Sequence, residues 1–259
     1  LGGELFQGPR NGGGVGTSLD GMARATGGTR TWRIVLDPRT YGSRSGTIWV
    51  AADHGVFKSS DGGRTWVETL DPTGLFPKTM AFDVAIDPVN PDILLAAGSA
   101  APYNASGDVI WNRILRSTDG GARWTEVLAI TTDQGALQRA VFARAPSNPS
   151  RVYVATNTYS RGVQVHRSDD GGATWVSLPR PNSLLSHQGD YALTLEVDPV
   201  DPRVVYFGGI DFYRSTDAGA TWQATSRNEL HVDIHQVAFD GRGFMYVAND
   251  GGISRSFDR

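Results

Sequence analysis

The chain has 259 residues, of which 39% are hydrophobic and 20% are charged, and its net charge is −3. These values are ordinary for a soluble globular protein, and the length suits one large all-β domain or two smaller domains. The weak negative charge excludes a general attraction to nucleic acid or to anionic membranes. Because the sequence has no cysteine, disulfides and thiolate metal sites are also excluded.

No apolar run approaches the roughly 20 residues that cross a membrane, so we predict no transmembrane segment, and no signal peptide is visible. Residues 1–30 are rich in glycine. Their run 11–16 lacks the Lys-Ser/Thr pair of a phosphate-binding loop, and we predict no cofactor. We interpret this segment as flexible or turn-forming, with the alternative that it supplies a strand that closes the fold.

A short motif recurs four times after residue 58. Its copies are SSDGGRTW at 59–66, STDGGARW at 117–124, SDDGGATW at 168–175 and STDAGATW at 215–222, and we call them boxes 1 to 4. A fifth copy starts at Ser256, and the copies follow at intervals of roughly 50 residues, which is the period of a four-stranded propeller blade. One copy can arise by chance, but four in register indicate a true repeat.

The residue types of the boxes suit a turn between two strands. An aspartate side chain can accept hydrogen bonds from nearby backbone amides and so hold a turn. The glycine pair supplies positive φ without a Cβ clash, and the tryptophan can pin the turn to its sheet by burying a large apolar area. We therefore predict a structural role for Asp61, Trp66, Asp119, Trp124, Asp170, Trp175, Asp217 and Trp222.

Four short strand patterns accompany each full box. In the first unit they cover 33–38, 47–51, 55–59 and 66–70. Regular strands also occur in sandwiches, but a self-similar unit of about 50 residues favours propeller blades. We predict an all-β propeller without helices, with blades at 31–70, 79–128, 138–178 and 191–225 and a partial blade at 235–259.

The partial fifth blade leaves two interpretations open. In one, residues 1–30 supply its missing outer strand and close a five-bladed ring. In the other, which we favour, the chain is part of a longer propeller. An unclosed propeller exposes a sheet flank, so we expect further blades or a partner chain to cover that edge.

The pattern S-x-D-G-G-x-T-W resembles the Asp-box (bacterial neuraminidase) repeat, and the resemblance covers about residues 31–258. It makes the chain similar to propellers of the sortilin, xyloglucanase and sialidase types. The resemblance implies that ligand-binding loops lie at one end of a central channel and the boxes at the other. It also implies an extracellular or periplasmic protein.

The loops at the implied channel end carry four of the five histidines and several carboxylates. Polar groups that converge on one pocket mouth form the default binding site of a propeller. We expect Trp111 in the longest of these loops, 98–111, where it could stack on a sugar ring or pack under its own loop. The candidate ligand-binding residues are His54, Trp111, Tyr159, His187, Asp190, Asp211, His231, Asp233 and His235.

The segment His231-x-Asp233-x-His235 deserves its own interpretation. In a strand, alternation would place the three side chains on one side. A metal site needs such convergence and a further ligand, and one short motif is weak support. We predict a polar channel lining and no metal.

Asp53 resembles, by its place after the second strand of an early blade, a catalytic aspartate of xyloglucanase-type hydrolases. Glycoside hydrolysis needs two carboxylates roughly 5–10 Å apart, and Asp250 occupies the equivalent position in the fifth blade. We name both as candidate catalytic residues. The sialidase arginine triad, tyrosine nucleophile and glutamate cannot be assigned.

Two functions therefore stay open. The first, which we favour, is a non-catalytic scaffold that binds a protein or a glycan. The second is an extracellular glycoside hydrolase, xyloglucanase-like or sialidase-like, or a fragment of one. The feature that separates them is whether two carboxylates face each other across an open groove with no arginine beside them.

Overall fold

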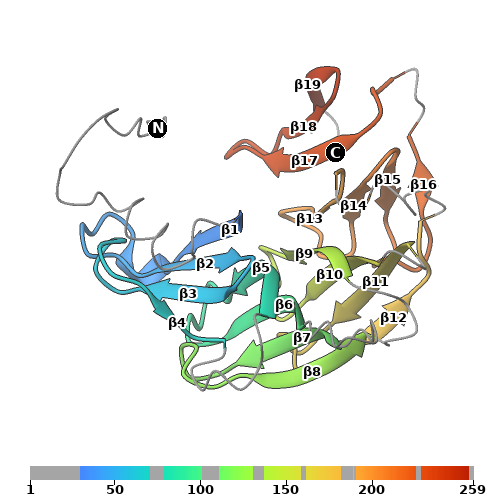
Figure 1. Cartoon of the computed structure of the whole chain (residues 1–259). Coiled ribbons are helices and arrows are strands. Elements are labelled where there is room, and N and C mark those ends of the chain that lie inside the picture. The colour runs from blue at the N-terminus through green and yellow to red at the C-terminus, as the bar shows by residue number, and fades with distance from the viewer. Residues whose placement is uncertain are drawn as a thin grey trace.

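The computed structural model describes residues 30–70, 79–100, 111–130, 137–158, 162–181, 189, 191–225 and 229–256. These residues form five antiparallel sheets, four with four strands and one with three. The sheets follow one another along an arc, from β1 in blue to β19 in red (Figure 1). The predicted all-β propeller is confirmed, and each sheet is one blade. Among the described residues, no helix is long and apolar enough to cross a membrane.

Blade 1 contains β1 (Thr31–Leu36), β2 (Ile48–Ala52), β3 (Gly55–Ser59) and β4 (Val67–Glu68), and blade 2 contains β5 (Thr79–Ile86), β6 (Leu94–Ala100), β7 (Trp111–Ser117) and β8 (Thr125–Ile130). Blade 3 contains β9 (Leu137–Arg144), β10 (Val152–Thr158), β11 (Gly162–Ser168) and β12 (Val176–Leu178). Blade 4 contains β13 (Thr194–Val197), β14 (Val205–Gly208), β15 (Phe212–Ser215) and β16 (Gln223–Ala224), and blade 5 contains β17 (Ile234–Phe239), β18 (Met245–Asn249) and β19 (Gly252–Ser256).

Within each blade, neighbouring strands follow chain order. The first strands of successive blades contact one another, β1 with β5, β5 with β9, β9 with β13 and β13 with β17. Antiparallel pairing places the start of each first strand beside the end of the second, as Thr31 opposite Ala52 and Ile234 opposite Asn249 show. We call this end of the blades the channel end. The boxes, between third and fourth strands, lie at the opposite end, which we call the box end.

Two local expectations were wrong. Trp111 is not in a loop, because it begins β7 and pairs with Ala100 of β6. The pairing of β6 with β7 extends further toward the channel end than the predicted strands did. A short 3-10 helix, η1 (Pro38–Thr40), follows β1 although no helix was expected. It forms because the Asp37 side chain accepts a bond from the Arg39 amide, while Pro38 takes a position that needs no donor.

Each box aspartate holds its own turn. In box 1, Asp61 accepts hydrogen bonds from the amides of Arg64 and Thr65, both at 2.9 Å, and from the Thr65 hydroxyl at 2.7 Å. The Ser59 hydroxyl donates to Asp61 and accepts from the Gly63 amide, both at 2.8 Å. The amide and hydroxyl of Thr65 are the main cause that lowers the pKa of Asp61 to about 2. The pKa values of Asp119, Asp170 and Asp217 are also lowered to about 2.

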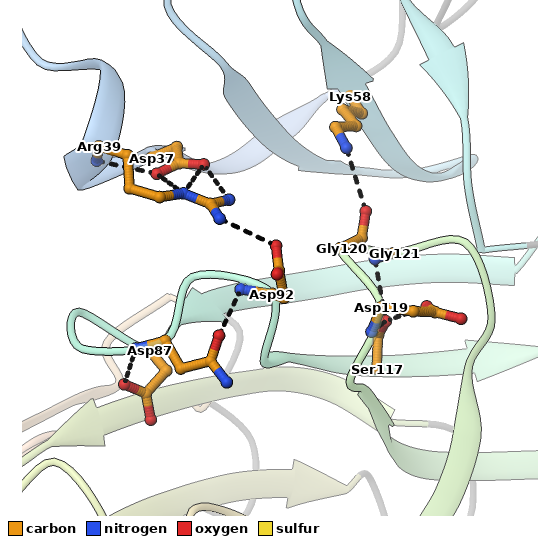
Figure 2. A network of polar contacts seen from close by, with 10 residues as sticks. Asp37, Arg39, Lys58, Asp87, Asp92, Ser117, Asp119, Gly120 and Gly121 are labelled. Atoms are coloured by element: carbon orange, nitrogen blue, oxygen red, sulfur yellow. Dashed lines mark hydrogen bonds and ion pairs between the residues drawn. The ribbon is translucent and has the colours of Figure 1, made fainter.

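Polar contacts tie blade 1 to blade 2 at the box end, as Figure 2 shows. The Lys58 ammonium donates to the carbonyl oxygen of Gly120 in box 2 at 3.1 Å. Arg39 pairs with Asp37 at 2.7 Å in its own blade and with Asp92 of blade 2 at 3.1 Å. The Lys58–Gly120 and Arg39–Asp92 contacts join residues 62 and 53 positions apart in the sequence, and they link the first blade to the second.

Four of the five hydrophobic clusters join neighbouring blades, and a smaller fifth cluster lies within blade 1. Trp49, Tyr153, Tyr206 and Phe207 are among the largest fully buried side chains. Each belongs to the second strand of its blade, where both faces of the sheet are covered. The blades therefore stabilise one another, which leaves the turns at the channel end available to carry function.

Candidate functional site

Several predicted site residues lie in turns or at strand ends of the channel end. Asp53 and His54 join β2 to β3, Asp211 lies between β14 and β15, and Asp250 lies between β18 and β19. The site has three parts, which are described in turn. They are the Asp53 corner (Arg30, Trp32, Asp53), the Asp250 cluster (Tyr191, His231, Asp233, His235, Asp250) and the channel wall (Arg33, Asp83, Glu196).

Asp53 is held by the start of its own blade. Its Oδ1 accepts a 2.7 Å hydrogen bond from the Trp32 indole, and its Oδ2 accepts from the amide and Nε of Arg30 at 3.3 and 3.4 Å. The Arg30 guanidinium also lies over the Trp32 ring, 4.9 Å from its centroid. The Asp53 carboxylate therefore fastens the entry of β1 to the end of β2, and an arginine partly neutralises it.

His54 follows Asp53 in the same turn. Its Nδ1 is buried and has no hydrogen-bond partner among the described residues. Buried polar atoms without partners are rare in proteins. The structure therefore gives the His54 Nδ1 no polar partner in this turn, and His54 is linked to Asp53 only as its neighbour in the chain.

The Asp250 cluster joins blade 4 to blade 5. The Tyr191 hydroxyl donates to the two carboxylate oxygens of Asp250 at 3.0 and 3.2 Å, and His235 Nε2 lies 2.7 Å from Oδ1. The rings of Tyr191 and His235 meet edge to face, with centroids 4.9 Å apart. Tyr191 is 53% exposed, and the His235 and Asp250 side chains are 35% and 37% exposed. This is an open, hydrogen-bonded trio at the rim.

Electrostatics in the cluster follow from these bonds. The contact with His235, followed by that with the Tyr191 hydroxyl, lowers the pKa of Asp250. The same hydroxyl contact raises the pKa of Tyr191 because the phenol donates to a carboxylate. At neutral pH the cluster therefore presents an ionised Asp250 and a protonated Tyr191.

The motif 231–235 does not behave as a strand. The Asp233 backbone has φ 60°, and β17 begins only at Ile234. The Asp233 amide donates to the carbonyl of Ile210 at 3.0 Å, which links the segment to blade 4. His231 packs on Gly251, where a Cβ would lie 2.8 Å from the His231 Cβ. The left-handed turn thus breaks the alternation assumed for three ligands on one side.

Asp211 helps to shape the turn that receives this segment. Its carbonyl accepts a 3.0 Å bond from the Gly209 amide, and the Gly209 carbonyl accepts a 2.7 Å bond from the Ile234 amide. Among the residues whose placement is described, no group of three or more His, Cys, Asp or Glu has an arrangement suited to a metal ion.

The channel wall contains charged residues that sequence reasoning missed. Arg33 of β1 pairs with Asp83 of β5, Nε to Oδ1, at 3.1 Å. Asp83 also accepts a 2.7 Å bond from the Phe142 amide of β9. Burial raises the pKa of Asp83, and the charge of Arg33 opposes this rise. The only sequence signal was a carboxylate inside the otherwise apolar strand TMAFDVAI.

Glu196 of β13 is the second acid of the channel wall. It is half-buried, and burial raises its pKa to about 7, while the Val197 amide and the charge of Arg33 act in the opposite direction. Its signal in the sequence was again a lone carboxylate, in the strand TLEV. Neither acid was among the predicted site residues, because a lone carboxylate in a strand pattern carries no recognisable motif.

Three predicted ligand residues, Tyr159, His187 and Asp190, lie outside the described residues. For Trp111 the backbone alone is described. The structure brings together Tyr191, His235 and Asp250, of which only Tyr191 had not been predicted. The two candidate catalytic residues have different partners. Asp53 is bound by Trp32 of blade 1, whereas Asp250 is bound by Tyr191 of blade 4 and His235 of blade 5. The site is thus a rim of paired polar groups around a charged channel wall.

No family model matches the chain, and no curated protein matches it. An ancestral GH74 enzyme shares its fold with a TM-score of 0.63 at 16% identity, over 87% of this chain and 30% of that one. A GH74 enzyme of Niastella koreensis has a TM-score of 0.44 at 16% identity, over 88% and 49% of the two chains. YCF48 bound to D1 peptide has a TM-score of 0.38 at 14% identity, over 89% and 93%.

These identities are low, so the first likeness shows the propeller fold alone. The chain spans less than a third of the length of the ancestral enzyme and about half of that of the Niastella enzyme. The resemblance to the Asp-box family, which was read from the four boxes, stays a prediction.

Proposed function

We propose that this chain is a non-catalytic binding propeller that takes a protein or glycan ligand at its channel end. The observation that supports the proposal is the pairing of its carboxylates. Asp53, Asp83 and Asp250 each accept hydrogen bonds from neighbouring groups. Asp53 and Asp83 also have an arginine beside them.

A glycoside hydrolase works differently. It needs one carboxyl group that can give a proton and a second that attacks or activates water across an open groove. The pKa of Asp250 is lowered by His235 and Tyr191, which makes it a poor proton donor near neutral pH. Asp53 is engaged by the Trp32 indole and by Arg30, which leaves it suited to hold the blade entry.

The Asp250 cluster provides what a binding rim needs. Tyr191 offers an exposed ring, and His235 and Asp250 offer polar edges beside it. An aromatic face with polar neighbours can stack on a sugar ring or cover an apolar side chain, while the polar groups orient the ligand. Because the three side chains already hold one another, a ligand would find them ordered.

A second function, a glycoside hydrolase or a piece of one, is favoured by one observation. Glu196 has a pKa raised to about 7 by burial, and a carboxyl group that keeps its proton near neutral pH is suited to act as a general acid. Asp83, at the same channel wall, would be its partner, but Arg33 and the Phe142 amide already occupy that carboxylate. We therefore rank this function second.

The first experiment measures reducing-sugar release from xyloglucan, soluble β-glucan and sialylated glycans. The wild type is compared with Asp53→Ala and Glu196→Gln, and folding of each is verified by circular dichroism. We expect no release from any of the three proteins. Release by the wild type that disappears in either variant would overturn the binding function and support the hydrolase.

The second experiment identifies the ligand. A glycan array and a displayed peptide library are screened with the wild type, and the selected ligand is measured on His235→Ala and Asp250→Asn. Asp201→Asn, whose side chain pairs with Arg203 near the box end, is the control. We expect at least about tenfold weaker binding in the two cluster variants, because a lost hydrogen bond to a charged group costs roughly 1.5–3 kcal/mol. The control should bind the ligand as the wild type does. Unchanged binding in both cluster variants would contradict the proposed site.

The expected location, extracellular or periplasmic, stays a prediction. It is tested by fractionating the source cells and detecting the protein with an antibody. Recovery from the cytoplasmic fraction alone would contradict it.

A further inference from the structure

Three arginines from two blades gather around one tryptophan at the channel end. The guanidinium carbon of Arg30, directly before β1, lies 4.9 Å from the centroid of the Trp32 ring. That of Arg139 in β9 lies 5.7 Å from the same centroid, so this side chain reaches from blade 3 to blade 1. Arg33, the next residue after Trp32, is the third arginine. We call Arg30, Trp32, Arg33 and Arg139 the arginine wall.

Blade 2 fastens the arginine wall from below. Phe82 packs against the Trp32 ring, with centroids 5.3 Å apart. Its neighbour Asp83 is buried, and burial raises the pKa of this carboxyl group, while the charges of Arg33 and Arg139 oppose the rise. Residues of three successive blades therefore hold the wall in one place.

Two of the guanidinium groups are tethered through a single nitrogen each. Arg30 Nε lies 3.4 Å from Asp53 Oδ2, and Arg33 Nε lies 3.1 Å from Asp83 Oδ1. Among the described residues these are the only ion pairs of the two side chains, which are 72% and 46% exposed. Because a guanidinium carries five N–H donors in a fixed fork, the terminal amino groups of both arginines are available to a ligand.

The charges around the arginine wall do not balance. Its three guanidinium groups are opposed by the carboxylates of Asp53 and Asp83. Burial raises the pKa of Glu196 in the channel wall to about 7, so this acid keeps much of its proton near neutral pH. The acids of blades 4 and 5 lie around the Asp250 cluster instead. A positively charged region on a protein of net charge −3 attracts an anionic partner.

The Trp32 ring indicates which kind of anion fits. Arg30, Arg139 and Phe82 already contact the ring, and its indole N–H donates to Asp53 at 2.7 Å. A sugar ring would need an open aromatic face on which to stack. What the wall offers is guanidinium donors, whose strongest partners are carboxylates bound by two parallel hydrogen bonds. The wall therefore suits acidic side chains better than an acidic sugar.

We propose that the arginine wall binds an acidic segment of a protein, whose Asp or Glu carboxylates accept hydrogen bonds from the terminal amino groups of Arg30 and Arg33. Arg139 adds positive charge to the same site. The inference rests on the proposed function, because it names the kind of partner that the channel end receives. It gives blades 1 to 3 a part in binding that differs in charge from the Asp250 cluster.

The probe is a capped hexaglutamate peptide with a fluorescent label, and a hexaglutamine peptide is its neutral counterpart. Fluorescence anisotropy measures the binding of both to the full chain at low salt, where exposed charges are weakly screened. We expect saturable binding of hexaglutamate that is at least about tenfold tighter than that of hexaglutamine. The affinity for hexaglutamate should fall steadily as salt is added.

Three arginine variants locate the binding. Arg30→Gln and Arg33→Gln each remove a donor fork and a charge, and we expect about tenfold weaker binding of hexaglutamate by each. The matched control is Arg123→Gln, because that side chain is 90% exposed and pairs with Asp119 at the box end. It should bind as the wild type does. The unfolding temperature of each variant verifies folding, and the exposed Arg30 keeps the test valid if Arg33→Gln fails to fold.

Asp53→Asn should act in the opposite direction. The amide oxygen can still accept from the Trp32 indole, but the negative charge beside Arg30 is lost. We expect roughly threefold or more tighter binding of hexaglutamate, because the wall becomes more positive. A purely structural role of this corner would make the variant bind more weakly or without change.

Four results would overturn the proposal. They are equal binding of the two peptides, unchanged binding by both Arg30→Gln and Arg33→Gln, no gain in Asp53→Asn, and tighter binding of oligogalacturonate than of hexaglutamate, which would make the wall a polysaccharide site. The proposed function is judged separately. It stands if the ligand selected from the glycan array or peptide library still depends on His235 and Asp250.

Discussion

The backbone amide of Phe142 in blade 3 donates a 2.7 Å hydrogen bond to the buried carboxylate of Asp83 in blade 2. The same carboxylate pairs with Arg33 of blade 1 at 3.1 Å. One side chain therefore joins three successive blades at the channel wall. This role of Asp83 depends on how three blades pack together, which no local sequence pattern predicts.

Removing this carboxylate should destabilise the fold. Asp83→Ala leaves the Phe142 amide without its acceptor and Arg33 without its partner, so we expect a loss of roughly 2–4 kcal/mol in the free energy of unfolding. Asp83→Asn keeps one acceptor and should lose less. The measurement is urea denaturation followed by tryptophan fluorescence.

The control for this prediction is Asp92→Ala. Its side chain is 51% exposed and pairs with Arg39, and exposed ion pairs contribute only about 0–1 kcal/mol. A loss in Asp83→Ala no larger than that in Asp92→Ala would show that the three-blade contact is not stabilising.

Gly62 and Gly171 occupy the same position in boxes 1 and 3, with φ 75° and 73°. A Cβ at Gly62 would lie 2.1 Å from the carbonyl oxygen of Arg44, whereas at Gly171 nothing lies within 4 Å. Box 4 has Ala218 at this position with φ 61°. We expect Gly171→Ala to cost about 1–2 kcal/mol from the left-handed backbone alone, and Gly62→Ala to cost a further 1–3 kcal/mol or so from overpacking.

Chemical denaturation of the two glycine variants measures this difference directly, since the backbone conformation is matched. Ala218→Gly is the reverse control, and it should be neutral or slightly stabilising because it relieves a positive φ. Equal losses in Gly62→Ala and Gly171→Ala would contradict the predicted clash with Arg44.

Glu196 should make stability depend on pH. Its pKa is about 7 in the folded protein against a reference value of 4.5. Between these values the unfolded chain has released the proton that the folded chain still holds, so the free energy of unfolding falls as pH rises from about 4.5 to 7. The contribution of Glu196 to the free energy of unfolding is fully present below pH 4.5. It falls by on the order of 1–3 kcal/mol as the pH rises to about 7.

Glu196→Gln removes this titration. We expect the variant to lose the decline between pH 4.5 and 7 and to be more stable than the wild type above pH 7. Urea denaturation at a series of pH values measures both curves. Parallel curves for the two proteins would show that Glu196 titrates as it does in the unfolded chain.

The Asp250 cluster predicts a spectroscopic change. The hydrogen bond from Tyr191 to Asp250 raises the pKa of Tyr191, so Asp250→Asn should return it toward the ordinary tyrosine value of about 10. Ultraviolet titration of the phenolate band, with Tyr191→Phe subtracted as a matched control, isolates this residue from the other tyrosines. The same titration curve with and without the Asp250 carboxylate would contradict the contact.

The sequence by itself determined the turns and the repeat. In each box, the aspartate binds groups three or four residues later, and the serine binds an amide four residues later. Such contacts depend on a few adjacent residues, so their pattern can be read locally. Five repeats at blade spacing then imply five sheets, and those sheets are found.

The tertiary structure alone decided which side chains meet. Tyr191 and Asp250 are 59 residues apart, and their contact depends on how blade 4 is turned against blade 5. The left-handed conformation of Asp233 is likewise set by its bond to Ile210 in the neighbouring blade, and it removes the alternation assumed for a strand. Asp83 and Glu196 were not predicted as site residues, because an alternating pattern does not say which strand face meets a channel. Contacts between blades depend on the angles between packed sheets, and no single repeat of the sequence specifies those angles.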